Sequence, residues 1–300
     1  MTAATATEAT TSSWELAEGD EIVPGRTALK RLGGGTRYDA YLAFDGHMHA
    51  VVVCKVVRPH LVEDERVLSG LAGEWEMLER LNHPVILRGF DSVLDGPRPH
   101  IVLEHLEGPR LSSLVRRYGT LPTEQLVPLG VQLCSAVHYL SNEGIVHLDI
   151  KPSNTIMGAP PRMIDLSVAL TTERAAEVIG TVGTDAYMAP EQCDPKRLGP
   201  IGHAADIWGL GVTLYRAATG VLPYSKPGAE DAPREVRWPQ LVEPPAPLEA
   251  RVPAEIADAI MTCLEFKPED RPTPAELSDR LESVLGALPR PRVARLKPRL

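Results

Sequence analysis

The hydrophobic pattern of this chain changes once, near Gly108, and that change limits the folds open to it. Residues 25–107 contain short β-rich runs and one segment with helical periodicity, whereas the rest of the chain carries mainly helical patterns. Strands with one helix, followed by helices, predict an α+β arrangement of two parts. A cleft between two such parts is where ligands commonly bind.

In the first part, the β-rich runs 39–44 and 50–57 flank Asp45-Gly46, which is typical of a hairpin. Residues 64–81 have apolar side chains at helical spacing and predict a helix. Two further strands are expected, at Val85–Leu87 and Ile101–Leu103.

In the second part, a stripe of apolar residues predicts a helix that ends at Gly144; its members are Leu126, Leu129, Leu133, Val137 and Leu140. Residues 205–219 are apolar on nearly all sides and predict a buried central helix. Residues 222–253 contain eight prolines and predict a long irregular connection. Thr273 and Glu276 form a capping box around Pro274 and predict a last helix through Leu285.

Composition and charge exclude several classes of protein. A hydrophobic content of 43% and a charged content of 24% are typical of a globular protein. The net charge of -9 argues against a nucleic-acid partner. No stretch approaches ~18 uninterrupted apolar residues, so no membrane span is expected, and no apolar run precedes the first basic residue, Arg26.

The four cysteines lie far apart and without metal-ligand spacing, so we expect reduced, buried thiols and a cytoplasmic location. Residues 1–20 are expected to be a flexible tail, because the Thr- and Ala-rich start lacks apolar content. Residues 288–300 hold four arginines and one lysine and are expected to be a basic tail. That tail is a candidate for weak contacts with an acidic partner, although a solvated end explains it equally well.

The strongest chemical signal is the segment His147-Leu148-Asp149-Ile150-Lys151-Pro152-Ser153-Asn154. A carboxylate is followed two residues later by an ammonium group and five residues later by a carboxamide. One short loop could direct all three into a single site. There Asp149 can accept the proton of a hydroxyl, Lys151 can stabilise a transferring phosphoryl group, and Asn154 can bind a magnesium ion.

This segment resembles the catalytic loop of eukaryotic-like (Hanks-type) serine/threonine protein kinases, most closely their bacterial members. The resemblance covers about residues 25–287. It implies a bilobal protein-kinase fold with a kinase domain at 21–287, divided into an N-lobe (21–107) and a C-lobe (108–287). It also implies ATP-dependent phosphoryl transfer to serine or threonine hydroxyls of a protein substrate, with ATP and Mg2+ (or Mn2+) as cofactors.

The resemblance extends to the nucleotide site. Gly33 and Gly35 match the first two glycines of the loop that covers the phosphates, while Tyr38 stands at the usual third glycine. A glycine cluster alone also fits a plain hairpin turn. Lys55 ends an apolar strand, as the phosphate-binding lysine does, and Glu74 matches its helical partner. Glu76 is a rival, but two residues of helix turn by about 200°, so only one glutamate can face the cleft.

Further motifs complete the expected set. Asp165 occupies the place of the magnesium-binding aspartate, and Thr184, in Gly183–Glu191, is expected close to Asp149 and Lys151. By the same resemblance, Asp206 accepts hydrogen bonds from the catalytic-loop backbone. A second expected pair, Glu191 with Arg271, is structural because loss of one buried partner leaves a stranded charge.

The expected adenine site combines backbone and side chains. The backbone at Glu104 and Leu106 is expected to pair with the base. Ala40 and Val53 are expected above it, with their sizes exchanged relative to the usual valine and alanine, which would roughly conserve the pocket volume.

Several departures keep a second interpretation open. Tyr38 replaces a glycine, Leu148 replaces an arginine that reads activation-segment phosphate, and Ser167 replaces the glycine after Asp165-Leu166. The alternative is a nucleotide-binding pseudokinase that acts as a scaffold. We also expect an enzyme that needs no phosphorylation of its activation segment, since leucine cannot bind phosphate.

Overall fold

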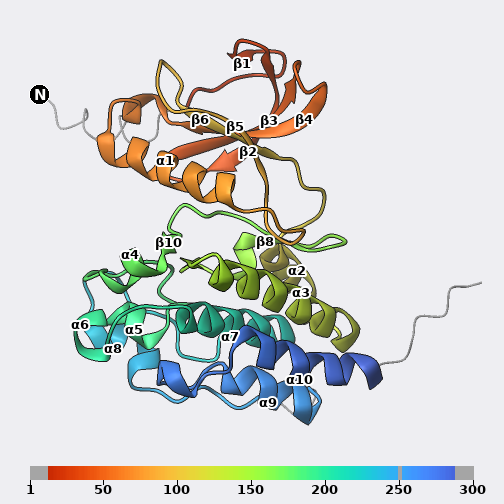
Figure 1. The fold of residues 1–300 in the computed structure, drawn as a ribbon, viewed down its shortest axis with the longest axis vertical. Coiled ribbons are helices and arrows are strands. Elements are labelled where there is room, and N and C mark those ends of the chain that lie inside the picture. The colour runs from red at the N-terminus through yellow and green to blue at the C-terminus, as the bar shows by residue number, and fades with distance from the viewer. Residues whose placement is uncertain (1–12, 249–251, 288–300) are drawn as a thin grey trace, which may run out of the picture.

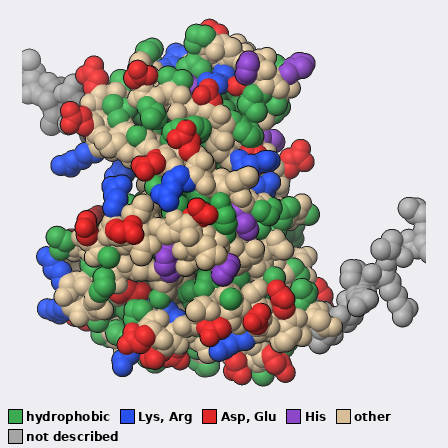
Figure 2. Space-filling model, viewed as in Figure 1, with side chains coloured by type: hydrophobic (Ala, Val, Ile, Leu, Met, Phe, Trp, Pro, Cys, Tyr) green, Lys and Arg blue, Asp and Glu red, His purple; other side chains and the backbone are tan. Residues whose placement is uncertain are grey.

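The computed structural model of the chain describes residues 13–248 and 252–287. Strands β1–β6 and helix α1 form one lobe, and the remaining helices form the other (Figure 1). The predicted α+β architecture with two lobes is confirmed. In the space-filling view the outline narrows between the two lobes, and Lys and Arg side chains lie along this waist (Figure 2).

The N-lobe is built on a six-stranded antiparallel sheet with strand order β1-β2-β3-β4-β6-β5. Its strands are β1 (Glu21–Val23), β2 (Arg26–Gly34), β3 (Tyr38–Asp45), β4 (Ala50–Val57), β5 (Gly89–Val93) and β6 (His100–Glu104). The predicted hairpin is the β3–β4 pair, with Asp45 opposite Ala50.

The two central strands alternate between a buried and a less buried face, strictly along β3 and over residues 52–56 of β4. On β3 and β4 the odd residues 39–45 and the even residues 52–56 are buried. Several of their apolar members, with Ile22 and Ala28, form a core on one side of the sheet. Side-chain alternation along a strand therefore puts Tyr38, Ala40, Val53 and Lys55 on the other face, which borders the cleft.

Residues 13–20 pack against the N-lobe, so the tail predicted for residues 1–20 does not extend to residue 20. Ser13 Oγ donates to Asp39 Oδ2 at 2.8 Å, and the Trp14 indole donates to Val57 O at 2.8 Å. Trp14 also packs on the sheet core beneath the guanidinium of Arg98. An indole supplies both apolar area and a donor, which a composition argument does not weigh. Residues 1–12 lie outside the described residues, as does the basic tail at 288–300.

Helix α1 (Glu65–Arg80) confirms the helix predicted at 64–81 and starts at the cap Asp64, whose side chain accepts from Arg66 N and Val67 N. The strand predicted at Val85–Leu87 is wrong. This segment forms only an isolated bridge between Ile86 and Met163 of the C-lobe, and the sheet strand β5 begins at Gly89. A short apolar run fits any buried extended segment, so the pattern could not distinguish a sheet strand from an inter-lobe connection.

The C-lobe is packed around helix α7 (Ala204–Thr219), the buried helix predicted at 205–219. Helices α3 (Thr123–Asn142) and α9 (Ala254–Thr262) pack against α7, and α10 (Pro274–Ala287) packs against α3 and α9 (Figure 1). All five members of the predicted stripe on α3 are buried. Thr273 and Glu276 form the predicted reciprocal cap before α10.

Shorter elements complete the C-lobe: α2 (Leu111–Tyr118), β7 (Ile145–Val146), β8 (Thr155–Ile156), β9 (Arg162–Met163), β10 (Leu170–Thr171), α4 (Thr172–Ala176), α5 (Pro190–Cys193), α6 (Pro195–Leu198) and α8 (Arg234–Arg237). The proline-rich connection is irregular over most of its described length, apart from α8 and a single 3-10 turn at Pro239–Leu241. All four cysteines are free and buried, as predicted. Across the described ranges, no helix combines the length and apolarity required to cross a membrane.

Candidate active site

The segment His147–Asn154 follows β7 as a loop at the C-lobe side of the cleft. Asp206, buried in the first turn of α7, accepts hydrogen bonds from His147 N at 2.7 Å and Leu148 N at 2.8 Å. Leu148 has a φ of +66°, a conformation that non-glycine residues seldom adopt without support. The Asp206 carboxylate supplies that support, as predicted, and so fixes the direction of the following side chains.

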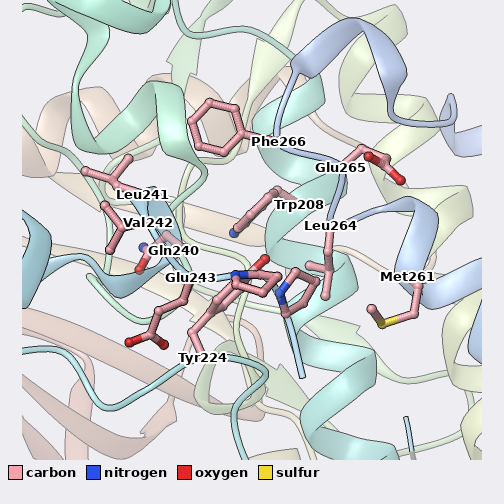
Figure 3. Close-up of a pocket in the computed structure, with 12 residues that line it drawn as sticks. Trp208, Tyr224, Gln240, Leu241, Val242, Glu243, Met261, Leu264, Glu265 and Phe266 are labelled. Atoms are coloured by element: carbon pink, nitrogen blue, oxygen red, sulfur yellow. The ribbon is translucent and has the colours of Figure 1, made fainter. Parts of the chain in front are cut away.

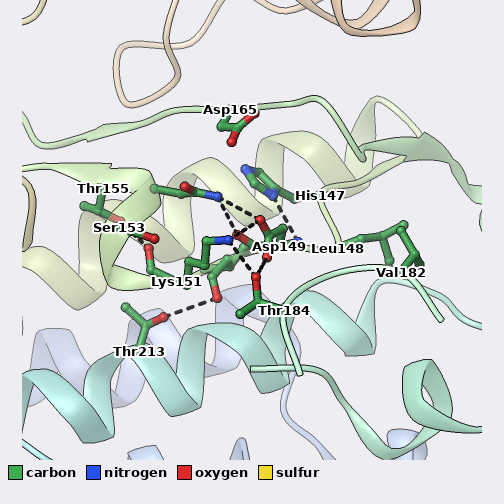
Figure 4. A network of polar contacts seen from close by, with 12 residues as sticks. His147, Leu148, Asp149, Lys151, Ser153, Thr155, Asp165, Val182, Thr184 and Thr213 are labelled. Atoms are coloured by element: carbon green, nitrogen blue, oxygen red, sulfur yellow. Dashed lines mark hydrogen bonds and ion pairs between the residues drawn. The ribbon is translucent and has the colours of Figure 1, made fainter. Parts of the chain in front are cut away.

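Three predicted residues of this loop and Thr184, from the segment 183–191, meet in one polar network (Figure 4). Lys151 Nζ donates to Asp149 Oδ2 at 2.7 Å and to Thr184 Oγ1 at 2.6 Å, and Thr184 Oγ1 donates to Asp149 Oδ1 at 2.6 Å. Asn154 Nδ2 donates to Asp149 Oδ2 at 3.1 Å and to Asp149 O at 3.0 Å. Asp149 thus accepts a hydrogen bond from an aliphatic hydroxyl beside an ammonium group.

A second cluster lies where the N-lobe faces this loop. Lys55 Nζ, on β4, donates to Glu74 Oε2 at 2.5 Å and to Asp165 Oδ1 at 3.4 Å. Glu74 is buried, whereas Glu76 is exposed, so the choice between the two glutamates is settled by helix geometry. The three groups are far apart in sequence, and folding brings them together across the two lobes.

The electrostatics of this cluster keep Lys55 and Asp165 charged. Burial would lower the pKa of Lys55, but Glu74 and Asp165 outweigh it and raise that pKa. Burial would likewise raise the pKa of Asp165, but Lys55 and a hydrogen bond from Ser167 lower it to about 2. Asp165 is therefore a carboxylate at neutral pH, and Figure 4 shows it above the catalytic-loop network.

Asn154 and Asp165 offer the oxygen ligands that Mg2+ prefers. The amide nitrogen of Asn154 is committed to Asp149, which leaves its oxygen as the free end of the carboxamide. Asp165 is ionised, and its side chain is 38% exposed. This donor set fits a magnesium ion that takes its remaining ligands from water and phosphate.

The predicted glycine loop connects β2 to β3 above the cleft. Gly33 has a φ of +142°, which favours glycine, and Gly35 N donates to Tyr38 O at 3.0 Å. A Cβ on Gly34 would lie 2.6 Å from both Tyr38 O and Asp39 Oδ1, so this glycine is also required, although the motif did not single it out.

The segment between the lobes begins at the end of β6. Arg88 and Arg162 both pair with Glu104 Oε1, at 2.9 and 3.2 Å, and Glu104 N donates to Arg88 O. These contacts fix the backbone at Glu104, and Leu106 follows two residues later in the connection. Ala40 and Val53 lie on the cleft-facing side of the sheet, as described above.

Gln192 is a residue of this region that sequence reasoning missed. Its Nε2 donates to Leu148 O at 3.0 Å and to Val182 O at 2.9 Å. It therefore joins the catalytic loop to the segment that ends at Thr184. The position next to Glu191 gave no signal, because a glutamine after a motif is usually a surface residue.

Glu191 and Arg271 form the predicted pair, between α5 and the start of α7. Arg271 Nη1 and Nη2 donate to the two carboxylate oxygens of Glu191 at 2.6 and 2.8 Å. Both side chains are buried. Arg271 also donates to three backbone carbonyls, those of Ala204, Glu265 and Phe266.

A cavity of about 380 Å³ lies elsewhere in the C-lobe, between α7, the proline-rich connection and the end of α9 (Figure 3). Trp208 and Tyr224 stack in its wall. Phe266 and two glutamates, Glu243 and Glu265, also line it. None of the residues in the Asp149 network or the Lys55 cluster lines this cavity, so it is separate from both of them.

Comparison with known proteins agrees with this geometry. A family model described as "Protein kinase domain" matches residues 26–281. The chain is 29% identical over 271 residues to the serine/threonine-protein kinase PknB of Mycobacterium leprae, which covers 86% of this chain and 42% of the relative. It is 31% identical over 267 residues to the probable serine/threonine-protein kinase PkwA of Thermomonospora curvata, covering 87% of this chain and 35% of the relative. The chain thus spans less than half the length of these bacterial relatives.

Proposed function

The chain belongs to the protein kinase family, and from that premise we propose that it transfers the γ-phosphoryl group of ATP to serine or threonine hydroxyls of proteins. This proposal is supported by two clusters: Lys55, Glu74 and Asp165 meet where the lobes face each other, and Asp149, Lys151 and Asn154 meet on the C-lobe side. Relatives named as serine/threonine-protein kinases support the same substrate class.

In this proposal the nucleotide lies under the glycine loop. Gly33 and Gly35 cover the phosphates, Ala40 and Val53 lie above adenine, and the backbone at Glu104 and Leu106 pairs with the base. Lys55, positioned by Glu74, binds the α- and β-phosphates. Asn154 and Asp165 would hold Mg2+ (or Mn2+), which would neutralise negative charge on the phosphates.

The chemical step follows from the catalytic-loop network. The substrate hydroxyl oxygen forms a bond to the γ-phosphorus, the bond to the bridging oxygen of ADP breaks, and the hydroxyl proton passes to Asp149. Lys151 neutralises the transferring group, and Thr184 holds Asp149 and Lys151 in register. The hydrogen bond that the Thr184 hydroxyl donates to Asp149 supports this assignment.

We also propose a cytoplasmic location, because free thiols persist in a reducing compartment. Four free, buried cysteines support it. The expected contacts of the basic tail at 288–300 stay a prediction.

The test is an assay with γ-labelled ATP, magnesium or manganese and a generic protein substrate, comparing the parent with Asp149→Asn. Label on serine or threonine from the parent alone supports the proposal. ATP binding by both without transfer by either supports the scaffold alternative, and label on tyrosine contradicts the substrate class. A titration of the parent with ATP, run beside Ala40→Val plus Val53→Ala, tests the adenine site separately.

A further inference from the structure

Tyr38 lies in the cleft and has no part in the roles assigned above. It is the first residue of β3, directly after the glycine loop, and Gly35 N donates to its carbonyl oxygen. It shares the cleft-facing side of the strand with Ala40. A side chain therefore extends from the end of the loop into the cleft, at a position where a glycine would leave space.

The side chain of Tyr38 makes two contacts with groups central to the site. Its hydroxyl donates to Val67 O, in the first turn of α1, at 3.0 Å. Its ring centroid is 4.8 Å from Lys55 Nζ, within the range of a cation–π contact. Gly70 makes room for this arrangement, since a Cβ there would come within 3.2 Å of the Tyr38 hydroxyl.

These contacts fix helix α1 at two places on one face. Val67 and Glu74 are almost two turns apart, so they project to the same side of the helix. Tyr38 holds the helix at Val67 O, and Lys55 holds it at Glu74. Lys55 itself lies between the Tyr38 ring and the Glu74 carboxylate. Burial raises the pKa of Tyr38, so its hydroxyl is protonated at neutral pH and able to donate.

We propose that Tyr38 is a positioning residue: it ties the phosphate-covering loop to α1 and holds Lys55 ready for phosphate before nucleotide binds. The proposal rests on the proposed function for the role of Lys55. In this proposal the Tyr38 side chain links the loop to α1, so the Lys55–Glu74 pair stays assembled without contacts from the activation segment.

The first experiment measures binding of ATP and of adenosine by calorimetry, in an Asp149→Asn background that prevents turnover. Tyr38→Phe removes only the hydroxyl bond, and we expect it to weaken ATP binding about two- to tenfold. Tyr38→Ala removes the ring as well and should weaken ATP binding further. Adenosine binding should stay within about twofold in both variants, because adenosine carries no phosphate for Lys55 to hold.

Tyr41→Phe is the matched control. It deletes a hydroxyl from the same strand, on the opposite face of the sheet, where Tyr41 contacts Ser13. An equal loss for ATP and adenosine in the Tyr38 variants would reduce Tyr38 to a general structural role. Unchanged or tighter ATP binding would overturn the proposal outright, the latter because it would mean that the ring obstructs the phosphates.

The second experiment measures hydrogen exchange of α1 amides without nucleotide, in the same background. Tyr38→Phe should increase exchange across the first half of α1 about two- to tenfold and leave α7 unchanged, because one hydrogen bond of the tie is lost. Unchanged exchange in α1 would contradict the tie. Since no nucleotide is present, a parent that fails to bind ATP would defeat the proposed function and leave this measurement to decide the tie.

Discussion

The pairs Glu191–Arg271 and Glu74–Lys55 each join a buried glutamate to a cation, and they differ in how many N–H donors of the cation form hydrogen bonds. Arg271 has five N–H donors, and it makes five hydrogen bonds, two to Glu191 and three to backbone carbonyls. Lys55 has three donors; two of them reach Glu74 and Asp165, and its side chain is 15% exposed at the cleft. A cation whose donors are all used is therefore structural, whereas a cation with an unused donor beside a cleft can bind a ligand.

The largest effect should come from the saturated pair. Arg271→Met strands the Glu191 carboxylate in the core, and breaking such a pair typically lowers the free energy of unfolding by about 3–5 kcal/mol. Urea unfolding of the parent and the variant measures this difference. Arg280→Met, which removes an exposed arginine of α10 and its hydrogen bond to Thr262, is the control and should change stability by about 1 kcal/mol or less. If Arg271→Met lowered the free energy of unfolding by less than about 1 kcal/mol, the Glu191–Arg271 pair would not have the structural role assigned to it.

Lys55→Met should show the opposite division between activity and stability. We expect kcat/KM to fall about 10²- to 10³-fold, as when a preorganised electrostatic donor is removed. Stability should change less than in Arg271→Met, because burial already raises the pKa of Glu74 and a lone Glu74 can become neutral. Kinetics and urea unfolding of one preparation test both parts. Equal destabilisation by the two variants would show that saturation does not separate the pairs.

Much of the Lys55–Glu74 pair and its surroundings could be predicted from the sequence, because the order of residues along the chain specifies it. Asp149, Lys151 and Asn154 lie within one short loop, so few chain conformations can separate them. Lys55, Glu74 and Asp165 required the family resemblance, since nothing in their local sequence places them together. The structure brings each of these residues to the cleft.

The parts that could not be predicted depend on contacts between distant segments. Tyr38 read only as a missing glycine, because its partners Val67 and Lys55 are defined by the packing of α1 against the sheet. Gln192 carried no motif, although it bridges two loops. The attachment of Trp14 was missed because composition alone does not show where one aromatic side chain will find an apolar surface.

The charge of Asp165 should make its stabilising interaction with Lys55 depend on pH. Its pKa in the folded protein is lowered from the model-peptide value to about 2, so the stabilisation that it contributes is complete above the unfolded value of about 3.9 and is lost as pH falls towards 2. The advantage of the parent over Asp165→Asn in melting temperature should therefore be constant from pH 7 to about 5 and shrink below about 4. An advantage that grows as pH falls would reverse the sign and remove Asp165 as the counter-ion of Lys55.

The smallest effect is expected for the threonines of the activation segment, Thr171, Thr172 and Thr181. A phosphate on this segment would find no cation at Leu148, because the side chain there is apolar. This leucine is 3% exposed in the core, and Gln192 holds its carbonyl oxygen together with that of Val182. Thr171 caps α4, Thr172 contacts His203 at 3.0 Å, and Thr181 is exposed. Replacing all three threonines with alanine should lower kcat/KM less than about threefold and stability by about 1 kcal/mol, chiefly through loss of the cap. Kinetics corrected for the folded fraction measure the change in kcat/KM. Unfolding followed by circular dichroism measures the change in stability. Abolished activity in a folded triple variant would mean that another cation binds the phosphate, and would contradict the expectation that the activation segment needs no phosphorylation.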